Sequence, residues 1–196
     1  MQCSCADNWS TTRIAAEKGL VWKTASYSDS KLIEIFLREG GTGNRSIDKF
    51  AREGLLTYAD ARYANTFLLI SAEGRMIGFV TNAMGSVKIT DSDLMGMNML
   101  PAGVSEIPVL FLHRIGVSIR DQRKGAAKLM VWRIFEVLSH SCINSAAAAV
   151  ALLVEPDNEP AKSLYASLLF EKVNSHHPDH ELHILPYEAA LRQIPK

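Results

Sequence analysis

The sequence has little of several features that would assign a protein to a specialised class. It contains three cysteines in 196 residues, too few for a disulfide framework, and we expect them to be reduced thiols. The longest apolar run, from Ala146 to Val154, is far too short to span a bilayer. The first residues lack a basic segment followed by an apolar one, so no secretory signal is expected. We therefore expect a cytoplasmic location without a membrane partner.

The sequence also lacks net charge, because 21 Lys and Arg balance 21 Asp and Glu. A neutral chain does not favour a general nucleic-acid coat, which is usually basic. The charges are nevertheless unevenly spread, because one short stretch contains six basic residues and a single acidic one, Asp121. These residues are Arg114, Arg120, Arg123, Lys124, Lys128 and Arg133. They form either a solvated helix face or a positive lip around a phosphate-bearing ligand, and the motif beside them favours the lip.

Hydrophobic periodicity and turn residues predict an α/β chain with mixed strand pairing. Residues 1–19 are polar and aperiodic and predict a flexible tail, whereas residues 20–196 predict a single domain. The Met- and Gly-rich segment 90–106 predicts a loop. The predicted strands cover residues 20–27, 66–71, 76–87, 109–117, 147–154, 170–173 and 181–185, and the predicted helices cover 30–37, 46–51, 123–140 and 161–168.

The most informative segment is a buried strand, a polar turn and the start of a helix, between Val109 and Ala127. Backbone amides at a helix N-terminus, with the helix dipole behind them, hold anions such as phosphate or pyrophosphate. Gly125 lets a ligand approach the main chain because it has no Cβ. The segment therefore predicts a phosphate-binding turn between a core strand and an amphipathic helix.

Two separated motifs resemble one enzyme family. Gln122-x-x-Gly125-x-Ala127 resembles the acetyl-CoA signature of the GNAT N-acetyltransferases, and residues 158–170 resemble that family's second motif, N-x-x-A-x-x-L/F-Y-x-x-x-G-F. The family's elements cover about residues 20–186. The resemblance implies a mixed central sheet whose two central parallel strands splay apart, flanked by helices, and acetyl-CoA as co-substrate without a metal.

The resemblance also implies roles for individual residues. Tyr165 falls where the family has the residue that protonates the departing CoA thiolate, and a phenol can do so because its pKa lies above that of a thiol. Periodicity alone favours a core aromatic at Tyr165, beside Leu164 and Leu168. Contacts to the pantetheine arm and the pyrophosphate are implied for Ile115, Gly116, Val117, Gln122, Arg123, Lys124, Gly125, Ala126, Ala127 and Asn158.

One position departs from the second motif, because Leu169 stands where the family has glycine. That glycine usually accepts a positive φ at a helix C-terminus. A leucine there implies either a different helix end or strain of about 1 kcal/mol.

A narrower resemblance concerns the acceptor. Residues 107–117 resemble a strand of the GNAT toxins of bacterial toxin–antitoxin modules, which acetylate the amino group of aminoacyl-tRNA and halt translation. This implies a ribbon-helix-helix antitoxin and a homodimer as partners. His113 is either a packed strand residue or an aid to catalysis, and Arg114 either forms a structural ion pair or contacts RNA phosphate.

Other functions stay open at this point. A GNAT acting on a polyamine, an aminoglycoside or a protein amine is the main alternative, since Asp91, Asp93 and Glu106 could form an acidic pocket. A third alternative is a degenerate GNAT kept as a binding module. The His-rich segment 176–180 is interpreted as a solvated loop rather than a metal site.

Overall fold

A seven-stranded mixed sheet forms the centre of the fold, with the strand order β1-β2-β3-β4-β5-β7-β6. The β1–β2, β2–β3, β5–β7 and β6–β7 pairs are antiparallel, and the β4–β5 pair is parallel. The strands are β1 (Leu20–Thr24), β2 (Asn65–Ser71), β3 (Met76–Lys88), β4 (Glu106–Val117), β5 (Ala151–Val154), β6 (Glu171–Val173) and β7 (Leu182–Pro186).

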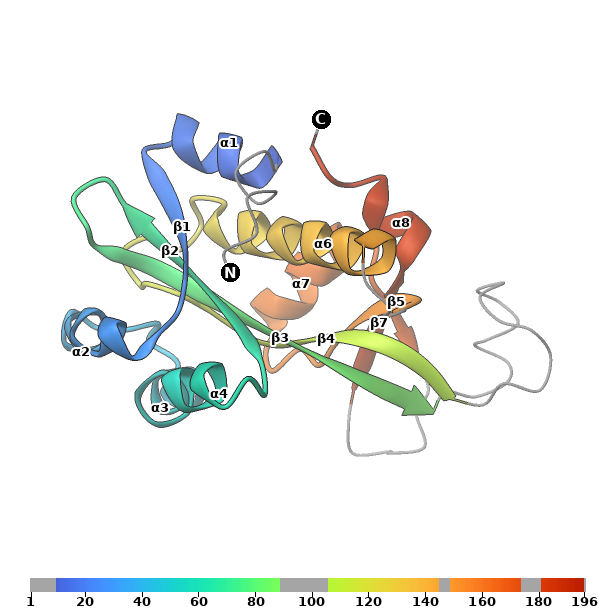
Figure 1. The fold of residues 1–196 in the computed structure, drawn as a ribbon, viewed down its shortest axis with the longest axis horizontal. Helices are drawn as coiled ribbons and strands as arrows, with labels where there is room; N and C mark the ends of the chain where they lie inside the picture. Colours follow the sequence, from blue (N-terminus) through green and yellow to red (C-terminus); the bar gives the residue numbers. More distant parts are fainter. Residues whose placement is uncertain (1–9, 89–105, 145–148, 174–180, 196) are drawn as a thin grey trace. The chain divides into compact units, whose positions relative to one another are not determined.

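The computed structural model describes residues 10–88, 106–144, 149–173 and 181–195, with the backbone alone at 141–144. Helices flank the sheet in this part of the chain (Figure 1). They are α1 (Ser10–Glu17), the 3₁₀-helix η2 (Tyr27–Asp29), α2 (Ser30–Arg38), α3 (Arg45–Glu53), α4 (Leu55–Asp60), α6 (Ala126–Asn144), α7 (Glu159–Ser167) and α8 (Tyr187–Leu191). None of the described helices is long and apolar enough to cross a membrane.

The described residues form two compact units. Unit 1 contains residues 10–82, 114–133 and 195, and unit 2 contains residues 83–88, 106–113, 134–144, 149–173 and 181–194. Three elements, β3, β4 and α6, each run from one unit into the other.

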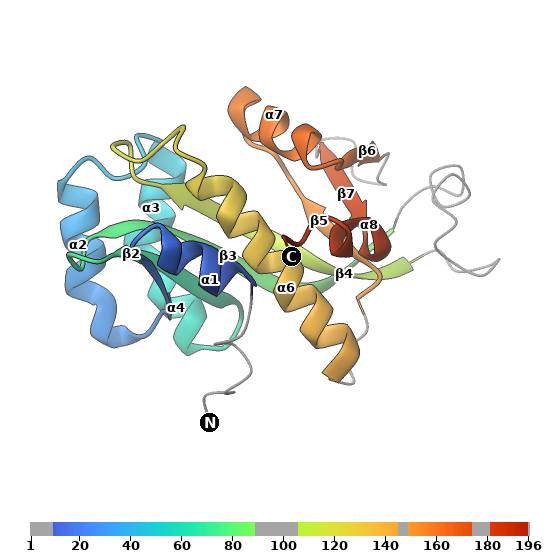
Figure 2. The ribbon, with the colours of Figure 1, turned by 90° about the horizontal axis from the view of Figure 1, so that it is seen from above.

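Unit 1 packs helices on both sides of its strands (Figure 1). On one side, α2–α4 cover the cross-strand pair Leu68 and Phe79, together with Phe36, Ala51 and Leu55. On the other side, α1 lies alongside α6 (Figure 2), and the Arg133 guanidinium of α6 packs over the rings of Trp22 and Phe67. The alternation of side chains along β2 thus supplies both faces of the unit.

Two glycines let β3 and β4 approach each other and their neighbours. A Cβ on Gly78 would lie 2.3 Å from the carbonyl oxygen of Gly116 and 2.5 Å from the methyl carbon of Met130. A Cβ on Gly116 would lie 2.6 Å from the Phe79 ring. Neither position has room for a side chain, so the end of β4 is fixed closely against β3 and α6.

Unit 2 is built around β5, all four of whose residues are buried. Ala151 and Leu153 pack with Val109 of β4 and Ile184 of β7 in one apolar cluster. The parallel pairing of β4 with β5 ends at Leu112 and Val154. The register leaves β4 to continue to Val117 beyond the last residue of β5.

The structure corrects the sequence analysis at the N-terminus. Residues 10–17, assigned there to a flexible tail, form helix α1; residues 1–9 lie outside the described residues. Thr11 and Ala15 are its buried positions, and neither residue type gives a strong hydrophobic signal. The carbonyl of Thr11 accepts a hydrogen bond from the Trp22 indole at 3.3 Å, so tertiary contacts stabilise α1.

Candidate functional site

The turn between β4 and α6 presents backbone amides at a helix N-terminus, as the sequence predicts. The first hydrogen bond of α6 runs from the Leu129 amide to the Gly125 carbonyl, at 3.1 Å. The amides of Ala126, Ala127 and Lys128 therefore precede the intrahelical ladder and are donors for a ligand. Gly125 has a φ of 87°, and a Cβ built on it would meet nothing within 4 Å. The main chain at Gly125 therefore faces open space, where an anion can approach the backbone amides.

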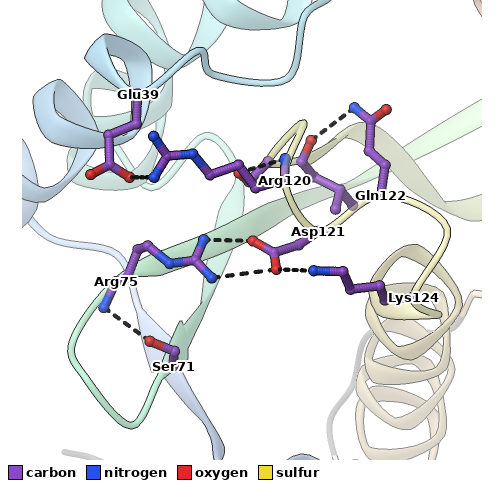
Figure 3. Close-up of polar contacts among 9 residues, drawn as sticks. Glu39, Ser71, Arg75, Arg120, Asp121, Gln122 and Lys124 are labelled. Carbon is purple, nitrogen blue, oxygen red and sulfur yellow. Dashed lines mark hydrogen bonds and ion pairs between the residues drawn. The ribbon is translucent and has the colours of Figure 1, made fainter.

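A buried carboxylate holds this turn in place (Figure 3). Asp121 accepts two hydrogen bonds from the Arg75 guanidinium, at 2.5 and 3.3 Å, and one from the Lys124 ammonium at 3.2 Å. The donation from Arg75 is the largest cause that lowers the pKa of Asp121. Arg75 lies in the β2–β3 hairpin, so that hairpin anchors the turn from one side.

The α2–α3 segment anchors the same turn from a second side. The Gln122 amide group donates to the Thr42 carbonyl at 2.7 Å and to the Val117 carbonyl at 3.2 Å. Arg120 forms an ion pair with Glu39 at 3.1 Å (Figure 3). The side chain of Gln122 thus connects the end of β4 to the turn before α3, because its amide group donates to backbone carbonyls of both segments.

The basic stretch does not form one continuous lip. Arg133 is 5 % exposed and donates to the Thr12 hydroxyl at 3.2 Å, so it belongs to the packing of unit 1 and the prediction was wrong for it. The Lys128 ammonium lies 4.9 Å from the centroid of the Trp132 ring. Arg120 and Lys124 are paired with carboxylates, as described above. The side chain of Arg123 is exposed on the turn itself.

The end of β4 lies beside this turn. Ile115 and Val117 are half-buried, Gly116 is buried, and Val117 is the residue whose carbonyl Gln122 contacts. The ring of His113 stacks on Phe111 at a centroid distance of 5.9 Å, and the two share a strand face as predicted. Arg114 is half-buried, and its carbonyl accepts from the Thr81 hydroxyl at 3.4 Å.

Helix α7 carries the second predicted motif within unit 2. Asn158 is its N-cap, and the side-chain oxygen accepts from the Ala161 amide at 2.9 Å. This leaves the NH₂ group of Asn158 as a separate donor. Lys162 pairs with Glu181, which precedes β7, at 3.0 Å. The start and middle of α7 are therefore both fixed.

Tyr165 lies in the last turn of α7 and is 3 % exposed. Burial raises the pKa of its phenol, and the negative charge of Asp157 raises the pKa further. Both effects disfavour the phenolate. Tyr165 therefore keeps its proton throughout the neutral range, which a proton donor requires.

The end of α7 adopts a left-handed turn without glycine. Leu169 has a φ of 60°, so the leucine is strained rather than the helix end displaced. The Phe170 amide donates to the Tyr165 carbonyl at 3.1 Å and the Leu169 amide to Ala166 at 3.0 Å, a Schellman motif. Its apolar contact is between the rings of Tyr165 and Phe170, 5.2 Å apart.

The sequence matches the Acetyltransferase (GNAT) family over residues 31–170. The chain belongs to the GNAT family. It is therefore an N-acetyltransferase, and acetyl-CoA is the usual donor of this family. A comparison with curated proteins gives no match.

Solved structures with the same GNAT fold include bacterial toxins. A Tyr→Phe variant of KacT has a TM-score of 0.74 at 19% identity and covers 89% of this chain and 98% of its own. AtaT complexed with acetyl-methionyl-tRNAfMet has a TM-score of 0.73 at 18% identity, over 90% and 99% of the two chains. AtaTR bound with AcCoA has a TM-score of 0.68 at 18% identity, over 91% and 99%.

The predicted GNAT residues fall into two groups. Unit 1 brings Ile115–Val117 and Gln122–Ala127 together through the contact of Gln122 with Val117, and unit 2 carries Asn158 and Tyr165 on one helix. Sequence reasoning missed Arg75, Thr42 and Gln193. Their contacts join residues 46, 80 and 25 positions apart, and no local pattern marks such pairs.

Charge divides unevenly between the two units. Among the described residues, unit 1 has 16 Lys and Arg against nine Asp and Glu, whereas unit 2 has four against eight. Of the acidic pocket considered above, Glu106 accepts a hydrogen bond from Ser86, and Asp91 and Asp93 lie outside the described residues, as does the segment 176–180.

Proposed function

We propose that this GNAT enzyme acetylates the amino group of an aminoacyl-tRNA, with acetyl-CoA as donor, and so acts as a toxin that blocks translation. The single observation that carries the RNA acceptor is the charge of unit 1, which is +7 over its described residues although the chain is neutral. Binding to nucleic acid rests largely on phosphate contacts with Lys and Arg. The complex of AtaT with acetyl-methionyl-tRNAfMet supports the same acceptor.

The donor site in this proposal is the turn before α6. The amides of Arg123 to Ala127 hold the pyrophosphate, helped by the exposed Arg123 side chain and by Lys124 once it leaves Asp121. The backbone of Ile115–Val117, beyond the β5 pairing, hydrogen-bonds to the pantetheine arm. The NH₂ group of Asn158 gives that arm a further donor. Acetyl-CoA supplies the activated thioester.

Tyr165 is the general acid of the proposed reaction. The acceptor amine, in its unprotonated form, forms the new C–N bond while the C–S bond breaks, and the phenol gives its proton to the departing sulfur. The acylated nitrogen releases one proton to water and the phenolate takes one back, so the products are the amide and the CoA thiol. A strong general base is unnecessary because an α-amino group titrates near neutrality. Arg114 lies in the basic unit and is proposed to contact RNA phosphate, and His113 is proposed as a residue near the acceptor.

The test uses purified protein, labelled acetyl-CoA and total charged tRNA. RNase-sensitive label on the RNA, lost in Tyr165→Phe and kept in Tyr27→Phe, is the expected result. Tyr27 is 61% exposed and is the matched control for loss of a phenol oxygen. Acetyl-CoA binding without label on RNA would overturn the RNA acceptor and direct the work to polyamines, aminoglycosides and peptides.

The partners of the proposed toxin are a ribbon-helix-helix antitoxin and a second copy of the chain. One neighbouring structure is AtaT bound to the C-terminus of the antitoxin AtaR. Co-expression with the product of an adjacent small gene should restore growth and give one co-eluting complex. Light scattering of the isolated chain checks the homodimer, and a monomer mass would contradict it.

A further inference from the structure

Leu169 adopts a backbone conformation that its residue type disfavours, and its side chain does not explain why. The φ of 60° is one that glycine accepts freely and leucine does not. The side chain is 65% exposed, so burial of the leucine contributes little to the turn. The Schellman hydrogen bonds and the contact between the Tyr165 and Phe170 rings hold this turn from within, and a contact from another segment adds to them.

That contact comes from the C-terminal segment. The Gln193 amide group donates to the Leu168 carbonyl at 2.6 Å. Gln193 is itself fixed, because its backbone amide donates to Ala190 of α8, and α8 begins at Tyr187 with a hydrogen bond to the Val150 carbonyl before β5. Leu168 is the C-cap of α7, where carbonyls have no partner within the helix.

We propose that Gln193 is a positioning residue: its hydrogen bond offsets the strain of Leu169 at the position where the family has glycine, and it holds the end of α7, with Tyr165, in place. The turn that it fixes is hydrogen-bonded to Tyr165 itself, because the Tyr165 carbonyl accepts from the amides of both Leu168 and Phe170. The start of α7 has its own supports in Asn158 and Lys162. Gln193 therefore acts on the C-terminal end of α7, which carries the Tyr165 phenol, and not on its start.

The inference rests on the proposed role of Tyr165. The kinetic part of its test depends on that role, whereas the hydrogen-exchange part does not. In Gln193→Ala, the Leu169 and Phe170 amides should exchange with deuterium about fivefold faster, the factor that one net hydrogen bond is worth. The value of kcat should fall by about the same factor while the KM for acetyl-CoA stays within about twofold. The isosteric Gln193→Glu, which has no donor at neutral pH, should behave alike, and Arg192→Ala is the exposed control.

The double variant decides between positioning and general stability. Leu169→Gly removes the strain that Gln193 offsets, so adding it to Gln193→Ala should restore both the exchange rate and kcat. Unchanged exchange and kcat in Gln193→Ala, or no recovery in the double variant, would overturn the proposal. If Tyr165→Phe keeps full activity, the proposed acid role fails by itself, and the exchange measurements still judge the contact.

Discussion

Arg123 in unit 1 and Leu169 in unit 2 share an unusual conformation but differ in what holds them. Their φ values are 62° and 60°, in a region that favours glycine. The turn at Arg123 is fixed by charged and polar side chains from two other segments, through Asp121 and Gln122. The turn at Leu169 is fixed by Gln193 and a ring contact. Ionic anchoring thus suits the half-site proposed to hold an anion.

The burial of Tyr165 at the end of α7 fits the role proposed for it. A phenol that donates a proton must stay neutral, and a cation beside it would favour the phenolate. Burial and the charge of Asp157 both raise the pKa of Tyr165. Unit 2 is also the acidic unit among the described residues. In the proposed function, unit 1 holds the pyrophosphate of the donor, whereas unit 2 donates the proton and contacts the pantetheine arm through Asn158; the predictions below test that division.

The largest effect is expected from Tyr165→Phe. Loss of the phenol oxygen removes the proposed general acid, so kcat should fall by about 100-fold or more. Acetyl-CoA affinity, measured by calorimetry, should stay within about twofold because the turn before α6 is unchanged. A parallel loss of affinity would show that the two units do not divide the work in this way.

Gly78→Ala should be the most destabilising of the single substitutions considered. The new Cβ would lie 2.3 Å from a backbone carbonyl oxygen, which has little freedom to move. We expect about 3 kcal/mol lower unfolding free energy, measured in urea. Gly74→Ala in the nearby hairpin turn is the control, because a Cβ there meets nothing within 4 Å.

Arg75→Met should affect donor binding more than catalysis. It leaves Asp121 buried without its main donor, at a cost of about 2 kcal/mol in unfolding free energy. The turn before α6 loosens, so the KM for acetyl-CoA should rise several-fold with kcat nearly unchanged. Adding Asp121→Asn removes a buried charge that keeps only Lys124 as its partner and should recover part of the loss, and no recovery would argue against an ionic anchor.

The same comparison explains what the sequence could predict. Both GNAT motifs are local, so the turn before α6 and the helix with Tyr165 could be located from spacing. Helix α1 could not, because its buried positions are Thr11 and Ala15 and its partner Arg133 is 121 residues away from Thr12. The anchors Arg75 and Gln193 were missed for the same reason, since tertiary hydrogen bonds leave no periodic signal.

Alkaline pH should destabilise the protein through Tyr165. The pKa of the buried phenol is raised above its unfolded value, so the stabilisation is fully present below about pH 10, the ordinary value for tyrosine. It is lost as pH rises above that value, by up to about 1.4 kcal/mol per pH unit. Urea unfolding between pH 8 and 11 checks this, and Tyr165→Phe should show a flatter profile than the unchanged chain.

The smallest effect expected is a gain, from Leu169→Gly. Glycine accepts the φ of 60° without strain, and the leucine side chain is too exposed for its loss to cost much burial. We expect about 1 kcal/mol higher unfolding free energy, whereas Leu169→Ala, which keeps a Cβ, should give no gain.

Arg123→Gly makes the same change in unit 1. The gain in unfolding free energy from Arg123→Gly should be similar to that from Leu169→Gly, because the strain depends on the residue that adopts the positive φ and not on the contacts that hold the turn. The consequence for binding should differ: Arg123→Gly removes an exposed cation and should weaken acetyl-CoA binding, whereas Leu169→Gly should leave it unchanged. Equal binding in both variants would show that the basic side chain of Arg123 contributes nothing to holding the donor.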